Sequence, residues 1–306
     1  MNLFRNINFD FVKYRYTAIT ISLVIITAGI ISMIIKGGLN LGVDFRGGVL
    51  MEIAFENNPD VAEVRSVLKT INLEESTIQQ VLNRNSIIIR INKEKVAENA
   101  EGTVYEKVNK QITEAFENKF GKNKIRFERV EYVGPLVGKD LKSKAVLATI
   151  FSWLGIIIYL SFRFEFKYGL AAVLALIHDV LITLSFFSFL NKEFNLTVLA
   201  AILTLIGFSV NDTIVIFDRI REDIRLYPKD NYPSLVNRSI NETLSRTILT
   251  TLTAIFSVVV LFLFGGPVIH DFAFALVIGF ISGTYSTVYI AAPILIDWEK
   301  IFPRKK

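Results

Sequence analysis

Six long stretches of the sequence carry almost no charge, and this pattern restricts the chain to one broad class of fold. An apolar run of about 18 or more residues is long enough to cross a lipid bilayer as an α-helix. Four of the runs contain no charged residue or histidine, one contains only Asp212, and one contains only His178 and Asp179. We predict membrane helices at residues 16–35, 145–162, 168–190, 196–217, 247–264 and 272–296.

The composition favours a membrane protein over a large soluble one. The hydrophobic fraction is 52% and the mean hydropathy is +0.44. The first apolar run is longer than the core of a secretory signal peptide and no small-residue cleavage site follows it, so we predict a signal anchor. The chain has no cysteine and two histidines, His178 and His270. We therefore expect no disulfide, no thiol nucleophile, no metal site and no cofactor.

Lys and Arg residues outside the predicted spans are distributed unevenly between the two sides of the membrane. Six spans place both termini on one side, which carries fifteen Lys and Arg residues, whereas the short opposite loops carry only Lys192. Because cytoplasmic segments carry this excess, we predict that residues 1–15, 218–246 and 297–306 are cytoplasmic. The net charge of +5 follows from this bias and gives no reason to expect nucleic-acid binding.

Residues 36–144 form one extracytoplasmic insert between the first two spans. We predict strands at 49–55, 77–82, 86–91 and 125–133, and helices at 59–70 and 102–120. The second helix has an apolar stripe at Val104, Val108, Ile112, Phe116 and Phe120. The order βαββαβ is that of a ferredoxin-like α+β domain, a fold that hosts many functions. The predicted fold is thus a membrane α-helical protein with one such inserted domain.

Both connections between the insert and the spans are rich in glycine. The first, LGVDFRGG, contains Gly42, Gly47 and Gly48, and the second, VGPLVGKDL, contains Gly134-Pro135 and Gly138. Glycine permits backbone angles that other residues resist, so these segments are expected to be bent and irregular. They are either ordinary linkers or a pair of conformational hinges, and the sequence favours neither.

Asp212 is the most informative polar residue inside a span. A carboxylate on a spanning helix costs about 2.5–3.5 kcal/mol near the bilayer centre, so it is rarely left facing lipid. Asn211 points about 100° away from it, which predicts protein or water on two sides of this helix. Arg246 opens the fifth span at a similar depth and is a possible ion-pair partner. Pairing would favour the charged carboxylate and burial the neutral one, and this balance suits a proton carrier.

A second buried polar pair, His178 and Asp179, lies near the middle of the third span. Imidazole titrates near neutral pH, so the pair is suited to carry protons. A hydrogen bond that packs two helices together would explain the same residues equally well. The sequence leaves both interpretations open.

Other features of the spans have simpler interpretations. Asp218, Arg219, Arg221 and Glu222 follow the fourth span, and they are predicted to continue its helix and to be solvated and ion-paired on the cytoplasmic surface. The segment that follows is predicted to hold a short interfacial helix over 235–244. Gly279 and Gly283 lie four residues apart in the sixth span, which is typical of a face where helices pack closely.

Three motifs together resemble one family of membrane proteins. They are LGVDFRGG after the first span, VGPLVGKDL before the second, and GFSVNDTIVIFDRIRE at the end of the fourth. With the single insert and six spans, the chain resembles the SecD/SecF family of Sec translocase subunits, within the resistance-nodulation-division superfamily. The resemblance covers essentially the full length. It implies half of a twelve-helix assembly, completed by SecD, in the bacterial inner membrane.

The family resemblance also implies a role. Such subunits assist late steps of preprotein export through the SecYEG channel, with YajC or YidC as further partners, and they draw on the proton-motive force. The implied proton-transport residues are Asp212, Arg246, Asp179 and His178, with Asn211, Asp44 and Arg46 as polar support. No reaction on a substrate is implied, so we expect a transport subunit and not an enzyme.

Three other functions have to be weighed against this one. Half of a proton-coupled small-molecule or lipid exporter of the same superfamily is the main alternative. An intramembrane enzyme would need a nucleophile and base, and the sequence shows no such set. A scaffold that only stabilises the channel would use the buried acid and arginine as structural contacts.

Overall fold

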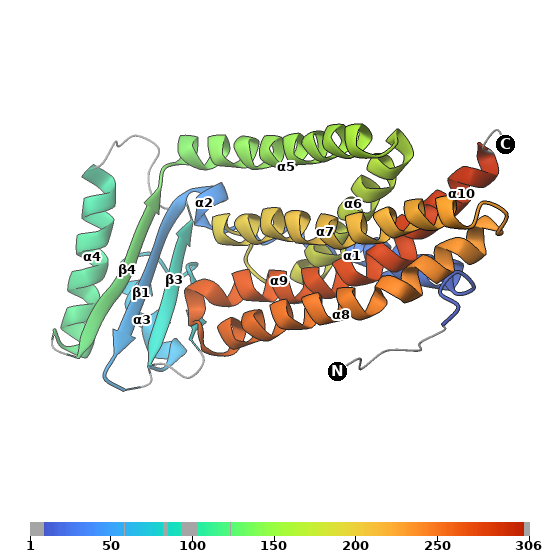
Figure 1. Ribbon diagram of the computed structural model, residues 1–306. Helices are drawn as coiled ribbons and strands as arrows, with labels where there is room; N and C mark the ends of the chain where they lie inside the picture. Colours follow the sequence, from blue (N-terminus) through green and yellow to red (C-terminus); the bar gives the residue numbers. More distant parts are fainter. Residues whose placement is uncertain (1–8, 58, 82–84, 93–102, 123, 303–306) are drawn as a thin grey trace. The chain divides into compact units, whose positions relative to one another are not determined.

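The computed structural model describes residues 9–57, 59–81, 85–92, 103–122 and 124–302 (Figure 1). The chain divides into two compact units. One consists of Met1–Asn40 and Leu147–Lys306, and is called the membrane unit below; the other, Leu41–Val146, is called the inserted unit.

Within the described residues, six helices are long and apolar enough to cross a membrane, as the sequence predicts. The helices that contribute to these spans are α1 (Arg15–Ile35), α5 (Pro135–Arg163), α6 (Phe166–Phe189), α7 (Leu196–Leu226), α8 (Tyr232–Phe264), α9 (Pro267–Ser286) and α10 (Ala292–Ile301). A π-helical turn, Thr287–Ala291, joins α9 to α10, so the sixth span is one long helix with a bulge.

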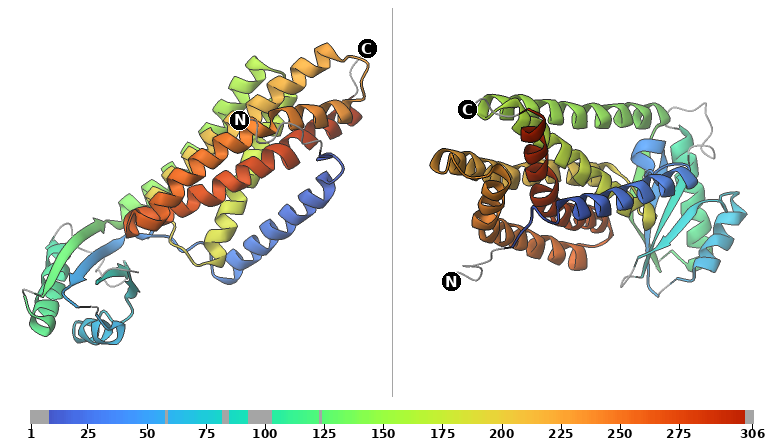
Figure 2. Two further views of the ribbon diagram at one scale, coloured as in Figure 1. Left: turned by 60° about the horizontal axis from the view of Figure 1, so that its bottom comes forward. Right: turned by 90° about the vertical axis from the view of Figure 1, so that its right-hand side faces the viewer.

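The helices of the membrane unit differ in how much of their surface they bury. α9 packs against α6, α7 and α8, while α1 packs against α6 (Figures 1 and 2). Few residues in the apolar stretches of α1, α5 and α8 are buried, whereas α6 is largely buried. Exposed apolar surface of this extent is expected where a helix contacts lipid or other apolar helices.

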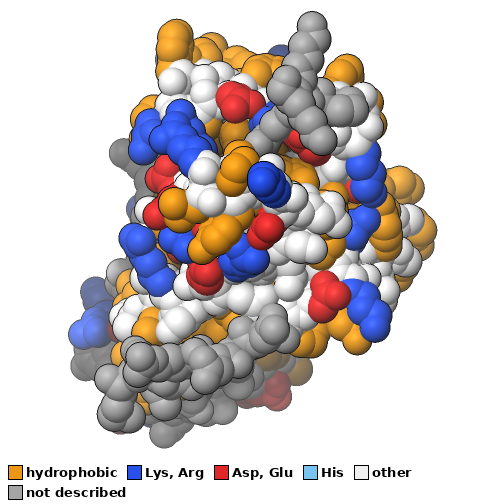
Figure 3. Space-filling view, turned by 45° about the vertical axis from the view of Figure 1, so that its right-hand side comes forward, with side chains coloured by type: hydrophobic (Ala, Val, Ile, Leu, Met, Phe, Trp, Pro, Cys, Tyr) orange, Lys and Arg blue, Asp and Glu red, His pale blue; other side chains and the backbone are white. Residues whose placement is uncertain are grey.

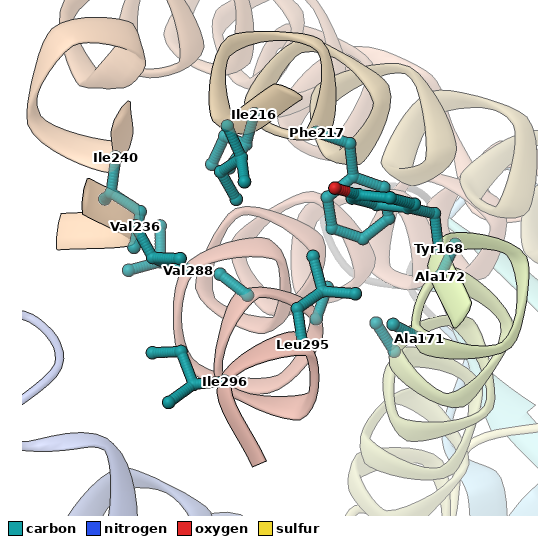
Figure 4. Packing of buried hydrophobic residues seen from close by; sticks show 14 of the residues in the cluster. Tyr168, Ala171, Ala172, Ile216, Phe217, Val236, Ile240, Val288, Leu295 and Ile296 are labelled. Atoms are coloured by element: carbon teal, nitrogen blue, oxygen red, sulfur yellow. The ribbon is translucent and has the colours of Figure 1, made fainter. Parts of the chain in front are cut away.

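A large apolar cluster joins α6, α7, α8 and α10 near one end of the membrane unit (Figure 4). Tyr168 of α6 and Phe217 of α7 pack edge to face with ring centroids 5.1 Å apart. Leu295 of α10 is fully buried in the same cluster. Because the interior is closely packed, the ends of these helices are fixed relative to one another.

The segment 218–246, predicted to be mainly a cytoplasmic loop, is mostly helical. α7 continues to Leu226 and α8 begins at Tyr232, so only residues 227–231 connect them. The separate interfacial helix predicted over 235–244 is likewise the first part of α8. The helical continuation predicted for residues 218–222 is observed, and it extends further than predicted because a helix does not have to end where its apolar stretch ends.

Polar side chains explain why both helices continue beyond the apolar segment. Arg219 of α7 makes ion pairs with Glu222, with the fully buried Asp223 at 3.1 Å, and with Glu242 of α8. The Ser239 hydroxyl of α8 donates to Asp223 Oδ2 at 2.6 Å. Asp218 pairs with Arg163 at 3.5 Å, so the ion pairing predicted for this surface is confirmed.

The inserted unit is a four-stranded antiparallel sheet with two helices on one face. Its strands are β1 (Gly48–Phe55), β2 (Thr77–Gln80), β3 (Ser86–Asn92) and β4 (Ile125–Val133), in the order β2-β3-β1-β4. The helices are α3 (Val61–Thr70) and α4 (Thr103–Phe120), and the short α2 (Val43–Arg46) precedes β1. The predicted element order, βαββαβ, is observed.

Alternation along the strands builds the core of the inserted unit. Every second residue of β1 and β3, such as Met51 and Ile89, is buried against α3 and α4. From α4, the predicted stripe residues Val108, Ile112 and Phe116 enter this core. α3 begins two residues later than predicted, because Asp60 caps it by accepting a hydrogen bond from Ala62 N at 2.9 Å.

Candidate functional site

Asp212 is buried inside the membrane unit, as the sequence predicts, and it is held by a threonine. Its side chain lies on α7 and the residue is 3% exposed. The Thr251 hydroxyl of α8 donates to Asp212 Oδ2 at 3.3 Å, and it also shares a hydrogen bond of 2.8 Å with Thr284 of α9. Three helices thus meet at this carboxylate. Asn211 is exposed on another side of α7.

Arg246 does not form the predicted ion pair with Asp212. No nitrogen of Arg246 lies within 4.0 Å of a carboxylate oxygen in the part of the chain that the structure describes, although the two charges interact electrostatically. Thr251 is level with Asp212, and Arg246 lies five residues before it, about 7–8 Å along α8. The arginine is exposed and sits one turn and a half nearer the polar end of the helix.

Asp179 is fully buried and is surrounded by hydrogen-bond donors from three helices. Ser282 of α9 donates to Oδ1 at 2.8 Å, while Ser209 of α7 and Ser286 of α9 donate to Oδ2 at 2.7 and 2.9 Å. His178 Nδ1 lies 3.1 Å from Oδ1. Hydrogen bonding of this completeness is what a buried carboxylate requires.

His178 connects this cluster to the first membrane helix. Its Nε2 lies 2.9 Å from the Ser22 hydroxyl of α1. Ser22 donates to the Tyr285 hydroxyl at 3.3 Å, and Tyr285 in turn donates to the carbonyl oxygen of Ala18 at 2.7 Å. The rings of His178 and Tyr285 also stack, with centroids 6.0 Å apart.

A run of six residues on the sixth span, Ser282–Thr287, bonds Asp179 directly and Asp212 through Thr251, and its hydroxyl residues were not singled out from the sequence. Ser282 and Ser286 bind Asp179, while Thr284 binds the partner of Asp212. Thr287 shares a hydrogen bond of 3.0 Å with Thr213 of α7. The signal was a string of small and hydroxyl residues, SGTYST, inside an otherwise apolar span.

The glycines of this span behave as predicted. A Cβ on Gly279 would lie 2.6 Å from Leu205 Cδ2, and one on Gly283 would lie 3.0 Å from Ser209 Oγ. Both neighbours belong to α7, so the two glycines allow α9 and α7 to approach closely. This contact brings Ser282 and Ser286 within reach of Asp179.

Charged side chains gather where the ends of α7, α8 and α10 lie. Figure 3 views the molecule with this end turned forward and shows Lys, Arg, Asp and Glu side chains interspersed among apolar ones. Described ion pairs here include Arg238–Asp230 and Lys300–Asp297, at 3.0 and 2.9 Å. Among the described residues, no group of three or more His, Cys, Asp or Glu side chains is placed to hold a metal ion.

Two family descriptions match this sequence. "Protein export membrane protein SecD/SecF, C-terminal" matches residues 111–301, and "SecD/SecF GG Motif" matches residues 31–59. The chain belongs to the SecD/SecF family. Its resemblance to that family, noted from the motifs, is thereby confirmed.

Curated relatives of this SecD/SecF chain carry the name "Protein translocase subunit SecF". The relative from Endomicrobium trichonymphae is 39% identical over 302 residues, which are 98% of this chain and 94% of the relative. The relative from Gemmatimonas aurantiaca is 41% identical over 305 residues, 99% of this chain and 91% of the relative. The name denotes a transport role, and the six apolar helices make the chain a multi-pass membrane protein.

Solved SecDF structures share the fold. The crystal structure of SecDF from Thermus thermophilus, described as a translocon-associated membrane protein, matches 98% of this chain with a TM-score of 0.85 and 31% identity. SecDF in a super-membrane-facing form matches 97% of it with a TM-score of 0.69 and 30% identity. The chain spans 40% and 39% of the length of these two SecDF chains.

The GG motif of the SecD/SecF family includes the first of the two predicted hinge segments. Gly47 and Gly48 have φ of 77° and 140°, angles that favour glycine, at the junction of α2 and β1. Gly42 has extended backbone with φ of −72°. In α2, Asp44 is half-buried and Arg46 is exposed, and neither lies near Asp212 in the sequence.

The second predicted hinge segment is not irregular. α5 begins at Pro135, so Gly138 lies within a helix, and its N–H bonds to the carbonyl of Gly134 at 3.0 Å. A Cβ on Gly138 would lie 3.1 Å from Gly47 N and 3.2 Å from Phe45 O. Here glycine is needed for close backbone contact with the GG motif and not for a bend.

Proposed function

We propose that this chain is an accessory subunit of the Sec translocase that, together with SecD, uses the proton-motive force to assist late steps of preprotein export through SecYEG. The observation that carries the proposal is the environment of Asp212. Its carboxylate is buried inside a spanning helix, accepts a hydrogen bond from the Thr251 hydroxyl, and lacks a direct ion pair with Arg246. A carboxylate so lightly held can change its protonation state at modest cost.

Asp212 is the proposed proton carrier and Arg246 its electrostatic partner. When Asp212 takes up a proton, Arg246 loses the opposing charge and the preferred packing of α7 against α8 changes. One charge moving through 100 mV releases about 2.3 kcal/mol, which is enough to bias an equilibrium between two conformations. The inserted unit would respond through the GG motif, where Gly42, Gly47 and Gly48 form the proposed hinge.

The proposed face for SecD lies on α7 and α8. Thr204, Gly207 and Asn211 are exposed at helical spacing on α7, and a Cβ on Gly207 would meet no atom within 4 Å. On α8, Arg246, Thr250, Thr253 and Ser257 form a matching exposed stripe. An arginine and an asparagine facing lipid would be unfavourable, so this face suits the helices of a protein partner.

The remaining assignments follow from the family role. The chain would lie in the bacterial inner membrane with both termini in the cytoplasm and the inserted unit outside. SecYEG and the moving preprotein would be its working partners, with YajC or YidC as further partners.

The test is an Asp212→Asn substitution, assayed for preprotein export that depends on the proton gradient. We expect export to fall to the level seen without the chain, while assembly with SecD is retained, because asparagine preserves the shape but cannot carry a proton. Asp218→Asn is the matched control, since this exposed acid lies six residues further along the same helix. Normal gradient-dependent export by Asp212→Asn would rule out the carrier role.

A further inference from the structure

The strongest unassigned feature of the membrane unit is the chain of hydrogen bonds around His178 and Asp179. It links α1, α6, α7 and α9 in the interior of the unit. The direction of each bond restricts the next one, because a hydroxyl has one hydrogen to donate. The directions therefore fix how many protons the pair holds.

The chain of bonds begins at an acceptor that can never donate. The carbonyl oxygen of Ala18 accepts from the Tyr285 hydroxyl at 2.7 Å. Tyr285 has then used its only hydrogen, so the 3.3 Å bond between it and Ser22 must be donated by Ser22. Ser22 has in turn used its own hydrogen. The 2.9 Å contact between Ser22 and His178 must therefore be donated by Nε2–H of the imidazole.

This result leaves one proton to be placed between His178 and Asp179. A neutral imidazole with its hydrogen on Nε2 has a lone pair on Nδ1, and that lone pair would face Asp179 Oδ1 at 3.1 Å. Two lone pairs do not attract each other. Either Nδ1 is also protonated and donates to a carboxylate, or Oδ1 is protonated and donates to Nδ1.

We propose that His178 and Asp179 hold one shared proton and act as positioning residues of net zero charge, not as steps in a proton path. Among the residues that the structure describes, Tyr285 is the one titratable group that joins them from another helix; α1 contributes Ser22, α7 contributes Ser209, and α9 contributes Ser282 and Ser286. Asp212 of α7 is bonded to Thr251 instead. A neutral pair also avoids leaving an uncompensated charge in the membrane interior.

The arrangement around α9 shows what the pair positions. Ser282 and Ser286 lie on the side of α9 that bonds Asp179, while Thr284 lies about 200° around the helix and bonds Thr251, the partner of Asp212. Asp179 thus holds α9 at the rotation that places Thr284 against Thr251. The number of protons held by His178 and Asp179 is inferred from the hydrogen-bond directions alone. The conclusion that the pair is not a step in a proton path rests on the proposed function.

The test is ¹⁵N NMR of the full chain labelled at histidine and held in lipid nanodiscs. The chain has only two histidines, so the imidazole signal of a His270→Gln variant comes from His178 alone. In the spectrum of the unaltered chain, the signal that this variant retains is that of His178. We expect Nε2 of His178 to carry a proton. An unprotonated Nε2 would overturn the proposal.

Tyr285→Phe gives a second outcome that simple destabilisation would not produce. The substitution keeps the ring that stacks on His178 but removes the acceptor for Ser22, so Ser22 can turn its hydrogen toward Nε2. We expect Nε2 to lose its proton and the pair to become singly negative, with Nδ1–H donating to Asp179. Tyr289→Phe, the same change one turn along the sixth span, should leave the His178 signal unchanged.

The two arms separate this proposal from the function proposed above. If Tyr285→Phe leaves Nε2 protonated, the directional chain is wrong whatever the protein transports. If the NMR results are as expected but the chain moves no protons, the proposed proton coupling fails and the shared proton stands.

Discussion

Hydroxyl side chains make most of the described polar contacts to Asp179 and Asp212. Three serines donate to Asp179, and one threonine donates to Asp212. The difference matters because a fully bonded carboxylate resists any change of charge, whereas one held by a single hydroxyl changes more easily. The two acids are therefore suited to different tasks, one to fixing helices and the other to carrying a proton.

Thr251→Val should weaken proton-driven export by removing the hydroxyl that holds Asp212 while preserving the shape of the side chain. A hydrogen bond to a charged group contributes about 1.5–3 kcal/mol, so we expect the rate to fall roughly tenfold or more. Thr251→Ser, which retains the hydroxyl, should recover most of the rate. Export assays under an imposed gradient measure both. Equal rates for the valine and serine variants would show that this bond has no part in the process.

The depth of Asp212 and Asp179 could be predicted from sequence because a charge within an apolar run is unusual and costly. The hydroxyls that bond them could not, since serine and threonine are tolerated anywhere in a span. Which of them face an acid depends on the rotation of α9 against α6 and α7. Arg246 was expected at a depth similar to that of Asp212, but Thr251 lies at that level instead. The sequence does not specify which residue of α8 lies level with Asp212.

Among the elements, α9 carries the largest share of the contacts that define the site. Its two glycines bring it against α7, and its polar run bonds Asp179 directly and Asp212 through Thr251. The π-helical turn that follows begins at Thr287, which bonds Thr213 of α7. π-Helical turns are rare in proteins as a whole, but those that occur often lie at functional sites. The sixth span therefore links the two acids through one helix.

Gly283→Ala should destabilise the membrane unit, because the new Cβ would lie 3.0 Å from Ser209 Oγ and 3.6 Å from Asp179 Oδ2. Overpacking of this kind typically costs about 1–3 kcal/mol. Gly155→Ala is the matched control, since a Cβ there would meet no atom within 4 Å. Thermal unfolding of the purified chain in detergent measures both. The expectation fails if Gly283→Ala unfolds at the same temperature as Gly155→Ala.

Element types could be predicted from sequence more reliably than element ends. Apolar windows located all six spans, and period-two alternation located β1. α7 continues past its apolar stretch as predicted, but the end of α7 and the start of α8 could not be placed, because Arg219, Asp223 and Ser239 satisfy one another across the two helices. Gly138 was misjudged for a similar reason, since its neighbour in space is Gly47, far away along the chain.

For the whole molecule, the exposed polar stripe on α7 and α8 implies that the membrane unit is completed by a partner. The matched SecDF chains are longer than this one, which spans 40% of the first. SecD is the proposed occupant of the stripe. The proton path would then lie where the two proteins meet, with Asp212 and Arg246 on this side of it.

Because the chain has no cysteine, a single introduced thiol can test this face. We expect Gly207→Cys to react readily with a membrane-permeant maleimide in the isolated chain and to be protected when SecD is present. Gly155→Cys on the exposed surface of α5 should react equally in both cases. Protection at residue 155 but not at 207 would place SecD on another face.

Proton movement itself is measured by reconstituting the chain with SecD in vesicles, imposing a proton gradient, and following the internal pH. We expect proton flux from the unaltered chain and from Asp218→Asn, and flux at the background level of empty vesicles from Asp212→Asn. Flux from Asp212→Asn equal to that of the unaltered chain would contradict the account, because the buried carboxylate would then not be the group that carries the proton.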